Sequence, residues 1–576
     1  MAETLISPGV LARENDSSFV TSGPITVGAA IIGPTVKGPV GVPTVVTSYA
    51  QYQQKFGTTF TSASSAYTYF TSIAAYNYFN NGGTSLLVAR VVSGTFDPAN
   101  SGTTGGPGQL ISGSAGVTNP VLVLETLAQG INQNSSSSLD VSGSLASGSA
   151  DNIRWQIVNS NTASGTFDLL IRQGDDNTLF PIIKETWINL SLDPFSPNYV
   201  SKVLGDQTQT LITTDSTYYL QTSGSFPNRS NYVRVKSVTN TPAYFDNTGI
   251  AKAQYTASIP INASGSFSSA VGTIMNGAQY YDAITDGNKS QGIPSSSYTN
   301  MITLLSNQDD YKYNILLTPG LFNSLQPSLI TNIISNAQNR GDFIYILDSV
   351  AYGKLVTDVI SQAASRNTSY AATYWPWVQV QDPDSGQNVW VPASTMIAGV
   401  YAYNDSVSEP WFAPAGISRG GLGNVIIAER RLSQTDRDNL YNGKVNPIAT
   451  FPGQGVVVYG QKTLQTRASA LDRVNVRRLL IALKSYISQV ANNLVFEQNT
   501  AATRNNFLAQ VNPYLESVQQ RQGLYAFQVI MDDTNNTPTV IDQNQMVGQI
   551  YLQPTKTAEF IYLDFNITPT GATFPA

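Results

Sequence analysis

The sequence contains no Cys and no His among its 576 residues. A chain without Cys has no disulfide bonds, thiolate metal sites or iron–sulfur clusters. A chain without His lacks the usual general base at neutral pH and the commonest metal ligand, which excludes Ser-His-Asp and Cys-His catalysis and His-bearing zinc sites. Carboxylate or Lys chemistry stays open. We nevertheless expect no enzyme activity and no catalytic, cofactor-binding or metal-binding residues.

Charged side chains are also scarce, at 12% of the chain against a usual ~25%. Neutral polar residues and Gly replace them, which suits a surface buried against other copies of the same protein. The net charge of −6 is small for this length. Because phosphate backbones attract clustered cations, this balance argues against nucleic acid as the main partner.

Long apolar segments are missing as well. The opening "MAETLISPGVLAREND" has an acid at Glu3 and a proline at Pro8, which does not fit a signal peptide. No run reaches the ~18 apolar residues that a membrane span needs. We expect a protein made in a cytosol that is not inserted in a membrane.

What the sequence does contain indicates an α+β protein with several domains. Residues 21–95 and 276–430 alternate strand and helix patterns, as in "YKYNILLTPG" and "SLITNIISNAQNR". This order predicts one discontinuous α/β domain with a parallel sheet. Residues 96–275 show short alternating strands and few helical patterns, which predicts an all-β insertion of one or two subdomains. Residues 1–20 are expected to form an extended arm.

Residues 431–576 predict a C-terminal α+β domain. "GVVVYG" is a strand, a long helix begins near Ala468, and a second helix covers 505–520 with a break near Pro513. Three strands follow, ending with the alternating "AEFIYLDFNI". Tryptophans at Trp375, Trp377 and Trp411 are expected in the core, because aromatic side chains dominate burial.

Several blocks of sequence resemble contractile-tail sheath proteins, and they occur in that family's order. They are "SPGV", "NLSLDPFSPNYVSKVLG", "YNILLTPG", "SYAATYWPWVQVQDPDSGQNVWVPASTMIAGVYAYND", "PWFAPAG", "NPIATFPGQGVVVYGQKTL", "NVRRLL", "LVFEQNT" and "DDTNNTP". The sequence differs at Leu11, where an aromatic residue often follows "PGV". The 96–275 insertion shares no pattern with the family except "NLSLDPFSPNYVSKVLG".

The resemblance implies a structural, motile protein of a phage tail. Hexameric rings of sheath stack helically around an inner tail tube, and contraction drives the tube through a bacterial envelope for genome delivery. The implied partners are the chain itself, the tube protein, and baseplate and tail terminator proteins, with assembly in the host cytoplasm and a final place in the virion. The sheath of a non-viral injection system, such as a bacteriocin-like particle or secretion apparatus, is the alternative.

Two further alternatives concern activity. The family's middle domain is described as similar to subtilisin-like folds, so a protease is one alternative. The missing His removes the catalytic triad of such a protease, and a fold alone does not establish an activity. A receptor-binding or decoration role applies only to the insertion.

The resemblance also points to inter-subunit segments at both ends. The family builds its inner domain from the N-terminal arm and the C-terminal part. We expect the arm, at Pro8, Gly9, Val10, Leu11, Ala12 and Arg13, to add a strand to a neighbour's sheet rather than fray. A terminal strand with Phe560, Ile561, Tyr562, Leu563 and Phe565 is either local or links neighbours.

The helix after Ala468 carries an apolar stripe on one face, formed by Val476, Leu479, Leu480, Leu483, Ile487, Val490 and Leu494. Arg473, Arg477 and Lys484 lie beside it on one edge. They form either a solvated basic edge or, as the resemblance implies, a surface that faces the tube.

Overall fold

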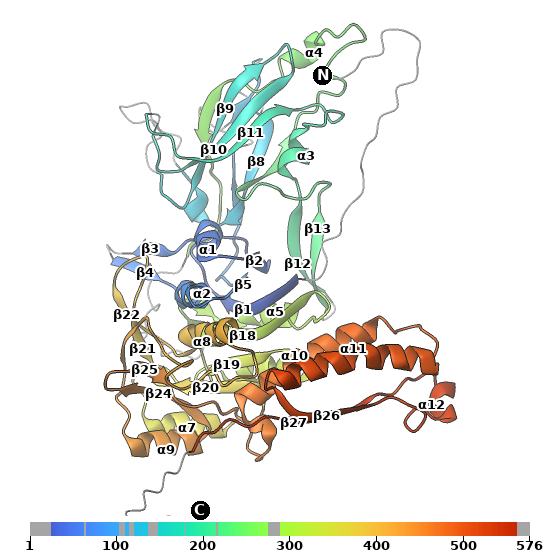
Figure 1. Ribbon diagram of the computed structural model, residues 1–576. Coiled ribbons are helices and arrows are strands. Elements are labelled where there is room, and N and C mark those ends of the chain that lie inside the picture. Colours follow the sequence, from blue (N-terminus) through green and yellow to red (C-terminus); the bar gives the residue numbers. More distant parts are fainter. Residues whose placement is uncertain are drawn as a thin grey trace, which may run out of the picture.

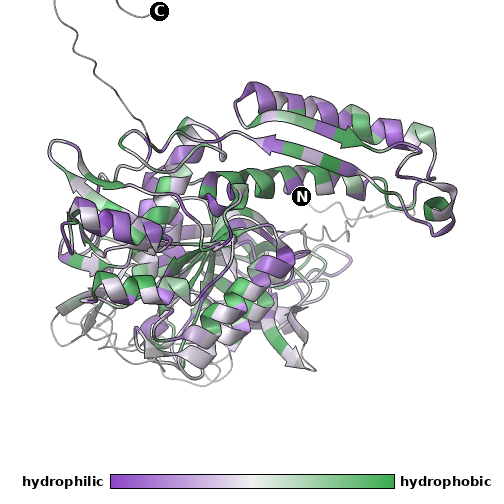
Figure 2. Cartoon of the chain, turned by 90° about the horizontal axis from the view of Figure 1, so that it is seen from below, coloured by the Kyte–Doolittle hydropathy of each residue, from purple (hydrophilic) through white to green (hydrophobic). Residues whose placement is uncertain are grey.

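The computed structural model describes residues 25–62, 65–102, 110–114, 120–135, 148–177, 179–214, 217–274 and 289–560 (Figure 1). An α/β body carries a β-rich insertion at one end. A module of helices and a two-stranded sheet projects from its side (Figures 1 and 2). The mixed α+β class predicted from the sequence is confirmed.

The body is built on an eight-stranded sheet whose central strands are parallel. In order across the sheet the strands are β2 (Thr44–Val46), β5 (Leu86–Arg90), β1 (Ile25–Gly33), β18 (Tyr311–Phe322), β19 (Ile344–Asp348), β20 (Ala371–Trp375), β24 (Val445–Phe451) and β25 (Gly455–Val458). Only the edge strands β2 and β25 are antiparallel to their neighbours. Both faces of β1 are buried, since Ala29 and Ile31 point into one core and Ala30 and Ile32 into the other. Strands covered on both faces are near-continuous apolar runs, as here.

Helices cover both faces of the sheet. One face is packed by α1 (Tyr49–Phe56), α2 (Phe70–Asn80) and α8 (Ser394–Val407), and the other by α5 (Ser295–Leu304), α6 (Pro327–Arg340), α7 (Val356–Ala364) and α9 (Gln434–Asn442). Smaller sheets complete the body: β3 (Thr59–Ser62) with β4 (Ser65–Thr68), β16 (Lys289–Ser290) with β17 (Ile293–Pro294), and β21 (Val378–Gln381) between β22 (Asn388–Val391) and β23 (Val425–Ala428).

The body is discontinuous in sequence. β1 lies between β5 and β18, so residues before and after the insertion share the sheet. The expected boundary near residue 430 is wrong, because β24 pairs in parallel with β20 and β25 follows it. The sequence of a short strand rich in β-branched residues, such as "GVVVYG", does not indicate which sheet the strand joins.

The insertion is a sandwich of two antiparallel sheets. One sheet contains β11 (Ile183–Ser191), β10 (Thr166–Gln173), β9 (Ile153–Asn161) and β15 (Ala263–Ser266), and the other contains β14 (Val233–Val238), β8 (Pro120–Gln129), β6 (Pro98–Asn100) and β7 (Ile111–Ser112). One core joins them, with Trp155 and Phe167 from the first sheet against Leu124 and Val233 from the second. The hairpin of β12 (Thr208–Thr214) and β13 (Thr217–Ser223) packs against α5 of the body. Short helices are present too: α3 (Val200–Leu204), α4 (Ala253–Thr256) and the 3₁₀ turn η1 (Ile131–Gln133).

The C-terminal module comprises residues 474–555. It contains α10 (Val474–Asn492), α11 (Ala501–Gln520), β26 (Leu524–Ile530), α12 (Pro538–Asp542) and β27 (Gln549–Pro554), and a 3₁₀ turn, η2 (Ala470–Asp472), precedes it. The break expected at Pro513 does not occur. The helix α11 is continuous across this residue. A helical Pro costs about 3 kcal/mol, and the buried side chains of Val511, Leu515 and Val518 against α10 offset that cost.

The tryptophans predicted in the core are buried there. Trp377 packs edge-on against Phe70 and stacks on Phe322, while its Nε1 donates to Val350 O at 3.1 Å. Trp375 and Trp411 are buried as well. None of the three offers an exposed stacking surface.

Candidate assembly surfaces

The apolar stripe predicted on α10 is confirmed and forms half of the module's core. Val476, Leu479, Leu483 and Val490 are buried, and Leu480, Ile487 and Leu494 pack at the margin of that core. Across the helix pair, the rings of Tyr486 and Tyr514 stack with their centroids 3.8 Å apart. The stripe therefore fixes the rotational orientation of α10 about its axis, and with it the direction in which the polar edge faces.

At Arg477 that polar edge faces the body rather than solvent. Arg477 is only 4% exposed, donates through Nη2 to Ser369 Oγ and lies 4.0 Å from the centre of the Tyr370 ring. Burial lowers the pKa of the Arg477 guanidinium from its ordinary value. The expectation that Arg477 is free to face a tube is wrong, because the segment before β20 covers this side of the helix.

Arg473 is also engaged inside the subunit. It is the N-cap residue of α10 and binds both oxygens of Glu559, with Nε–Oε1 2.7 Å and Nη2–Oε2 2.9 Å. Its Nη1 lies 3.0 Å from Asp472 Oδ1. Of the three cations, Lys484 alone is exposed, and its Nζ donates to Tyr370 Oη at 3.5 Å. Tube contact stays a prediction for Lys484.

A neighbouring arginine was not singled out from the sequence. Arg478 is buried, binds Asp405 Oδ2 of α8 at 2.5 Å and lies 4.7 Å from the centre of the Tyr401 ring. Together Arg473, Arg477 and Arg478 fasten the first turns of α10 to the body. The "NVRRLL" block marked the place, but helical periodicity does not reveal what covers a polar edge.

The two-stranded sheet of the module has an open face and open edges. Phe527, Val529, Ile550 and Leu552 are half-buried toward the helices. The opposite face is exposed and uncharged, with Ala526, Gln528, Gln549, Tyr551 and Gln553. Within the described ranges β26 and β27 pair only with each other. A two-stranded sheet with unpaired edges is a template for an added strand.

The segments predicted to link subunits lie mostly outside the described residues. This holds for Pro8 to Arg13 of the arm and for Ile561, Tyr562, Leu563 and Phe565 of the terminal strand. Phe560, the last described residue, is 69% exposed.

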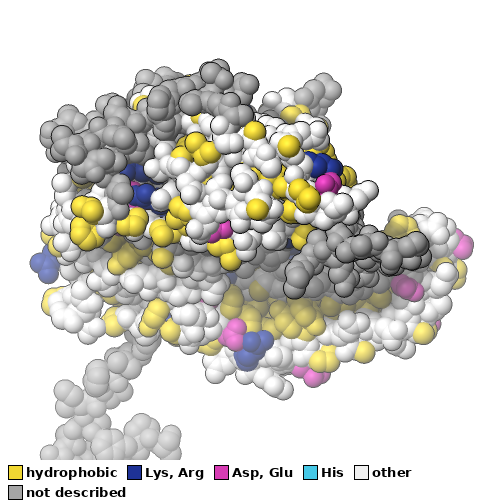
Figure 3. Space-filling view, turned by 90° about the horizontal axis from the view of Figure 1, so that it is seen from above, with side chains coloured by type: hydrophobic (Ala, Val, Ile, Leu, Met, Phe, Trp, Pro, Cys, Tyr) yellow, Lys and Arg dark blue, Asp and Glu magenta, His cyan; other side chains and the backbone are white. Residues whose placement is uncertain are grey.

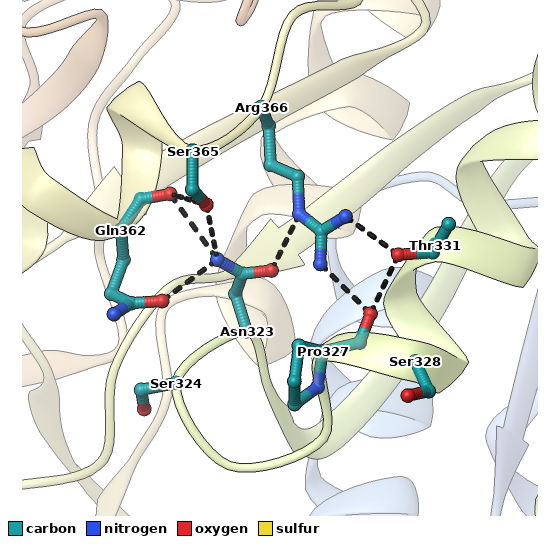
Figure 4. Close-up of a pocket in the computed structure, with 8 residues that line it drawn as sticks. All are labelled: Asn323, Ser324, Pro327, Ser328, Thr331, Gln362, Ser365 and Arg366. Carbon is teal, nitrogen blue, oxygen red and sulfur yellow. Dashed lines mark hydrogen bonds between the residues drawn. The ribbon is translucent and has the colours of Figure 1, made fainter.

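A hollow of the body lies between the start of α6 and the end of α7 (Figure 4). Arg366 donates from Nε to Asn323 Oδ1, from Nη1 to Thr331 Oγ1 and from Nη2 to Pro327 O. Asn323 Nδ2 in turn donates to Gln362 and Ser365. This network joins two helix ends, and the residues that line the hollow include no nucleophile paired with a base.

A buried carboxylate lies at the centre of the sheet, at the end of β19. Asp348 accepts hydrogen bonds from Ser394 N at 3.1 Å and Ser394 Oγ at 2.5 Å. Burial raises the pKa of Asp348 to about 7, although the Ser394 hydrogen bonds act in the opposite direction. A raised pKa alone marks a candidate acid, but Asp348 and Ser394 are both buried, so the pair has a structural role at the start of α8.

The face in Figure 3 shows no large concentration of one charge, because its few basic and acidic side chains are scattered among uncharged groups and several of them adjoin. In the described part of the chain, no three acidic residues come close enough to hold a metal ion. None of the helices described there is both long and apolar enough to cross a membrane.

Comparison with known families identifies this architecture. Residues 296–464 match the family described as phage tail sheath protein central domain, and residues 466–568 match the phage tail sheath C-terminal domain. Both regions are therefore similar to domains of the phage tail sheath family. The junction of the two matched regions falls shortly after β25, where the body ends and the sheath family's C-terminal part begins.

Individual sheath proteins are similar over shorter stretches. The tail sheath protein of Vibrio phage KVP40 is 43% identical over 208 residues, which are 36% of this chain and 31% of the phage protein. That of Enterobacteria phage T4 is 40% identical over 208 residues, 36% of this chain and 32% of the phage protein. The match thus spans about a third of the length of these curated relatives.

The fold is similar over a larger part of the chain. The crystal structure of a sheath tail protein from Listeria innocua has a TM-score of 0.52 at 9% identity, covering 92% of this chain and 95% of that one. The arrangement of body, insertion and C-terminal module is therefore a sheath fold.

Proposed function

We propose that the protein is the sheath of a contractile phage tail. Hexameric rings stack helically around the inner tube, and contraction drives the tube through a bacterial envelope. The observation that carries the proposal is the match of the body and of the C-terminal module to the two sheath domains. The open edges of β26 and β27 support it, because a polymer held by added strands needs such edges.

Identical subunits joined by contacts that do not close form helical arrays. In this proposal the arm at Pro8 to Arg13 and the terminal strand from Phe560 supply strands to the sheets of neighbouring copies. The uncharged outer face of β26 and β27 suits repeated contact with the same chain, since no like charges meet there.

The remaining partners are the tube, the baseplate and the tail terminator, and the tail of a virion assembled in the host cytoplasm is the location. Lys484 is the candidate for tube contact. No chemical step belongs to the proposal, which the absence of His and Cys from the sequence supports. The related proteins KVP40 and T4 sheath come from phages, which favours a virion over a non-viral injection system.

Proline substitution in the arm tests strand donation. Proline removes a main-chain N–H donor, and alternate residues of a strand direct their N–H groups to opposite edges. We expect either Val10→Pro with Ala12→Pro or Leu11→Pro with Arg13→Pro to abolish polymerisation, as seen by sedimentation and electron microscopy. Val10→Thr with Ala12→Ser is the matched control, because it keeps every donor.

Wild-type protein that stays monomeric at high concentration, with or without tube, would remove the sheath proposal. Proline variants that both polymerise like the control would instead leave the sheath in place and remove strand donation by this arm.

A further inference from the structure

Glu559 is held in a pocket of the body, just before the described chain ends. Its Oε1 accepts hydrogen bonds from Arg473 Nε at 2.7 Å and Gln461 Nε2 at 3.1 Å. Its Oε2 accepts from Arg473 Nη2 at 2.9 Å and from Tyr441 Oη at 2.5 Å. Four donated hydrogen bonds from three side chains satisfy this carboxylate, and the paired Arg contact is the strong, directional kind.

The pocket is positively charged without Glu559. Lys462 is 9% exposed, donates to Tyr441 O at 2.8 Å and lies 3.8 Å from the Tyr441 ring centre. Burial, together with the charges of Lys444 and Arg473, lowers the pKa of Lys462 to about 8. Burial raises the pKa of Glu559, but the hydrogen bonds from Arg473 and Tyr441 outweigh it and hold that pKa below its ordinary value.

The pocket is assembled from two segments of the body and from the start of the module's first helix. Tyr441 comes from the end of α9, Gln461 and Lys462 follow β25, and Arg473 caps α10. Gln461 Nε2 also donates to Thr557 Oγ1 at 2.6 Å. Residues 556–560 themselves form no helix or strand, so these side-chain bonds, rather than a sheet ladder, hold them.

The contact of Glu559 with Arg473, Gln461 and Tyr441, called the Glu559 clamp below, therefore lies where the chain changes direction. After β27 the chain returns from the projecting module to the body, Glu559 fixes it there, and the next side chain, Phe560, is exposed. Within the subunit this contact adds no strand, yet Gln461 is buried and Tyr441 and Arg473 are half-buried around the carboxylate.

We propose that the pocket of Tyr441, Gln461, Lys462 and Arg473 is a carboxylate receptor for Glu559 that fixes the point where the chain leaves its own subunit toward a second copy. This inference rests on the proposed function, because the second copy is a neighbour in the sheath. A force on the terminal segment is then transmitted to α10 through Arg473 and to the body through Tyr441.

The test uses the full-length protein with Glu559→Ala, Arg473→Lys and the control Glu516→Ala, an exposed carboxylate on α11. We expect trypsin to cleave after the exposed Lys556 about tenfold faster in Glu559→Ala, because the charged hydrogen bonds that hold this segment are lost. The protein concentration needed for polymerisation should rise about tenfold as well. Arg473→Lys keeps the charge without the paired donors and should be intermediate, and the thermal midpoint should match the control.

An unchanged rate of cleavage after Lys556 in Glu559→Ala would overturn the receptor. Faster cleavage with normal polymerisation would overturn its part in linking copies and leave the sheath function intact. Failure of the wild-type protein to polymerise would remove the proposed function and the linking role together, while the cleavage rate would still decide whether Glu559 holds the segment. A lowered thermal midpoint in Glu559→Ala alone would reduce the contact to ordinary fold stability.

Discussion

Arg477 and Lys484 lie two turns apart on α10 and both approach Tyr370, yet only Arg477 is buried. The Arg477 guanidinium is buried against Ser369 and the Tyr370 ring, and its Nε has no partner in the described part of the chain. Lys484 extends from the same edge into solvent. The same substitution at the two positions therefore compares the effect on stability at a buried contact with the effect at an exposed one.

We predict that Arg477→Glu destabilises the subunit by about 3–5 kcal/mol, because it leaves an uncompensated buried charge against an aromatic ring. Lys484→Glu is the matched control and should change stability by less than about 0.5 kcal/mol. Denaturant unfolding of the monomer measures both. Equal midpoints for the two variants would contradict the burial of Arg477.

Asp348 gives the body a dependence on pH. Its pKa is about 7 in the folded protein against an ordinary value of 3.8, so the folded state binds the proton more tightly. The stability from this group is fully present below about pH 4 and is lost as pH rises through 7.

Asp348→Asn removes that titration and keeps a side chain of the same shape. We expect the unfolding free energy of wild type, relative to the variant, to fall by roughly 2–3 kcal/mol between pH 5 and pH 8. Denaturant unfolding followed by tryptophan fluorescence at the two pH values gives the difference. A difference that stays constant across this range would show that Asp348 does not titrate there.

At the scale of elements, the insertion is joined to the body through a narrow neck. Asp97 N donates to Val271 O at 3.0 Å, and Val271 N donates to Asp97 O at 3.4 Å, so the two ends of the insertion lie side by side. Beyond the neck, specific contacts also join the insertion to the body: Lys37 Nζ lies 3.2 Å from Asp151 Oδ1, and Gln54 Nε2 donates to Tyr232 Oη at 2.6 Å. Arg90 Nη1 donates to Gln129 O at 3.0 Å, and Leu211 and Leu220 of the β12–β13 hairpin pack at the edge of the body's core (Figure 1).

We predict that replacing residues 98–270 with a short Gly-Ser linker leaves a folded body with a lower thermal midpoint. The body keeps its sheet and helices, but α5 loses the cover of the hairpin. Leu211→Ser with Leu220→Ser in the full chain exposes the same surface and should account for much of the decrease. Circular dichroism and thermal unfolding compare the three proteins. An unfolded deletion variant would show that the insertion is part of the body's folding unit.

The elements that sequence patterns could predict are those with a strong period or a continuous apolar run. The α10 stripe and the β-α-β order of the body are of this kind, since burial on one or two faces dictates the pattern. The partner of a short strand such as β25, and the cover over the edge that holds Arg477, depend on distant residues. Tertiary contacts decide the strand pairing and the cover of the helix edge, and a local sequence pattern contains no information about them.

At the scale of the molecule, three arginines connect the module to the body. Arg478 binds Asp405 of α8, Arg477 binds Ser369, and Arg473 binds Glu559 in the clamp. Trp411 Nε1 also donates to Arg521 O at 3.0 Å across the same junction. Each buried contact is costly to break alone, so the junction should hold while contacts between subunits exchange. In the proposed sheath, contraction is then a motion of whole subunits.

The absence of native Cys makes this testable, because two introduced cysteines are the only labelling sites. We predict that Ser361→Cys on α7 and Asn505→Cys on α11, both exposed, carry a dye pair whose energy transfer is the same in extended and contracted sheaths. Labelled subunits are diluted in unlabelled protein so that only distances within one subunit count. The energy transfer should stay constant because the arginine contacts hold module and body together.

The control for this measurement adds Arg478→Ala with Arg477→Ala, which removes two of the three arginine contacts. Energy transfer in that variant should broaden or shift, showing that the dye pair is sensitive to the junction. If the unmodified junction gives different energy transfer in the two sheath states, the module moves on the body during contraction. The hinge would then lie at the first turn of α10, between the Glu559 clamp and the apolar stripe that seats the helix in its own module.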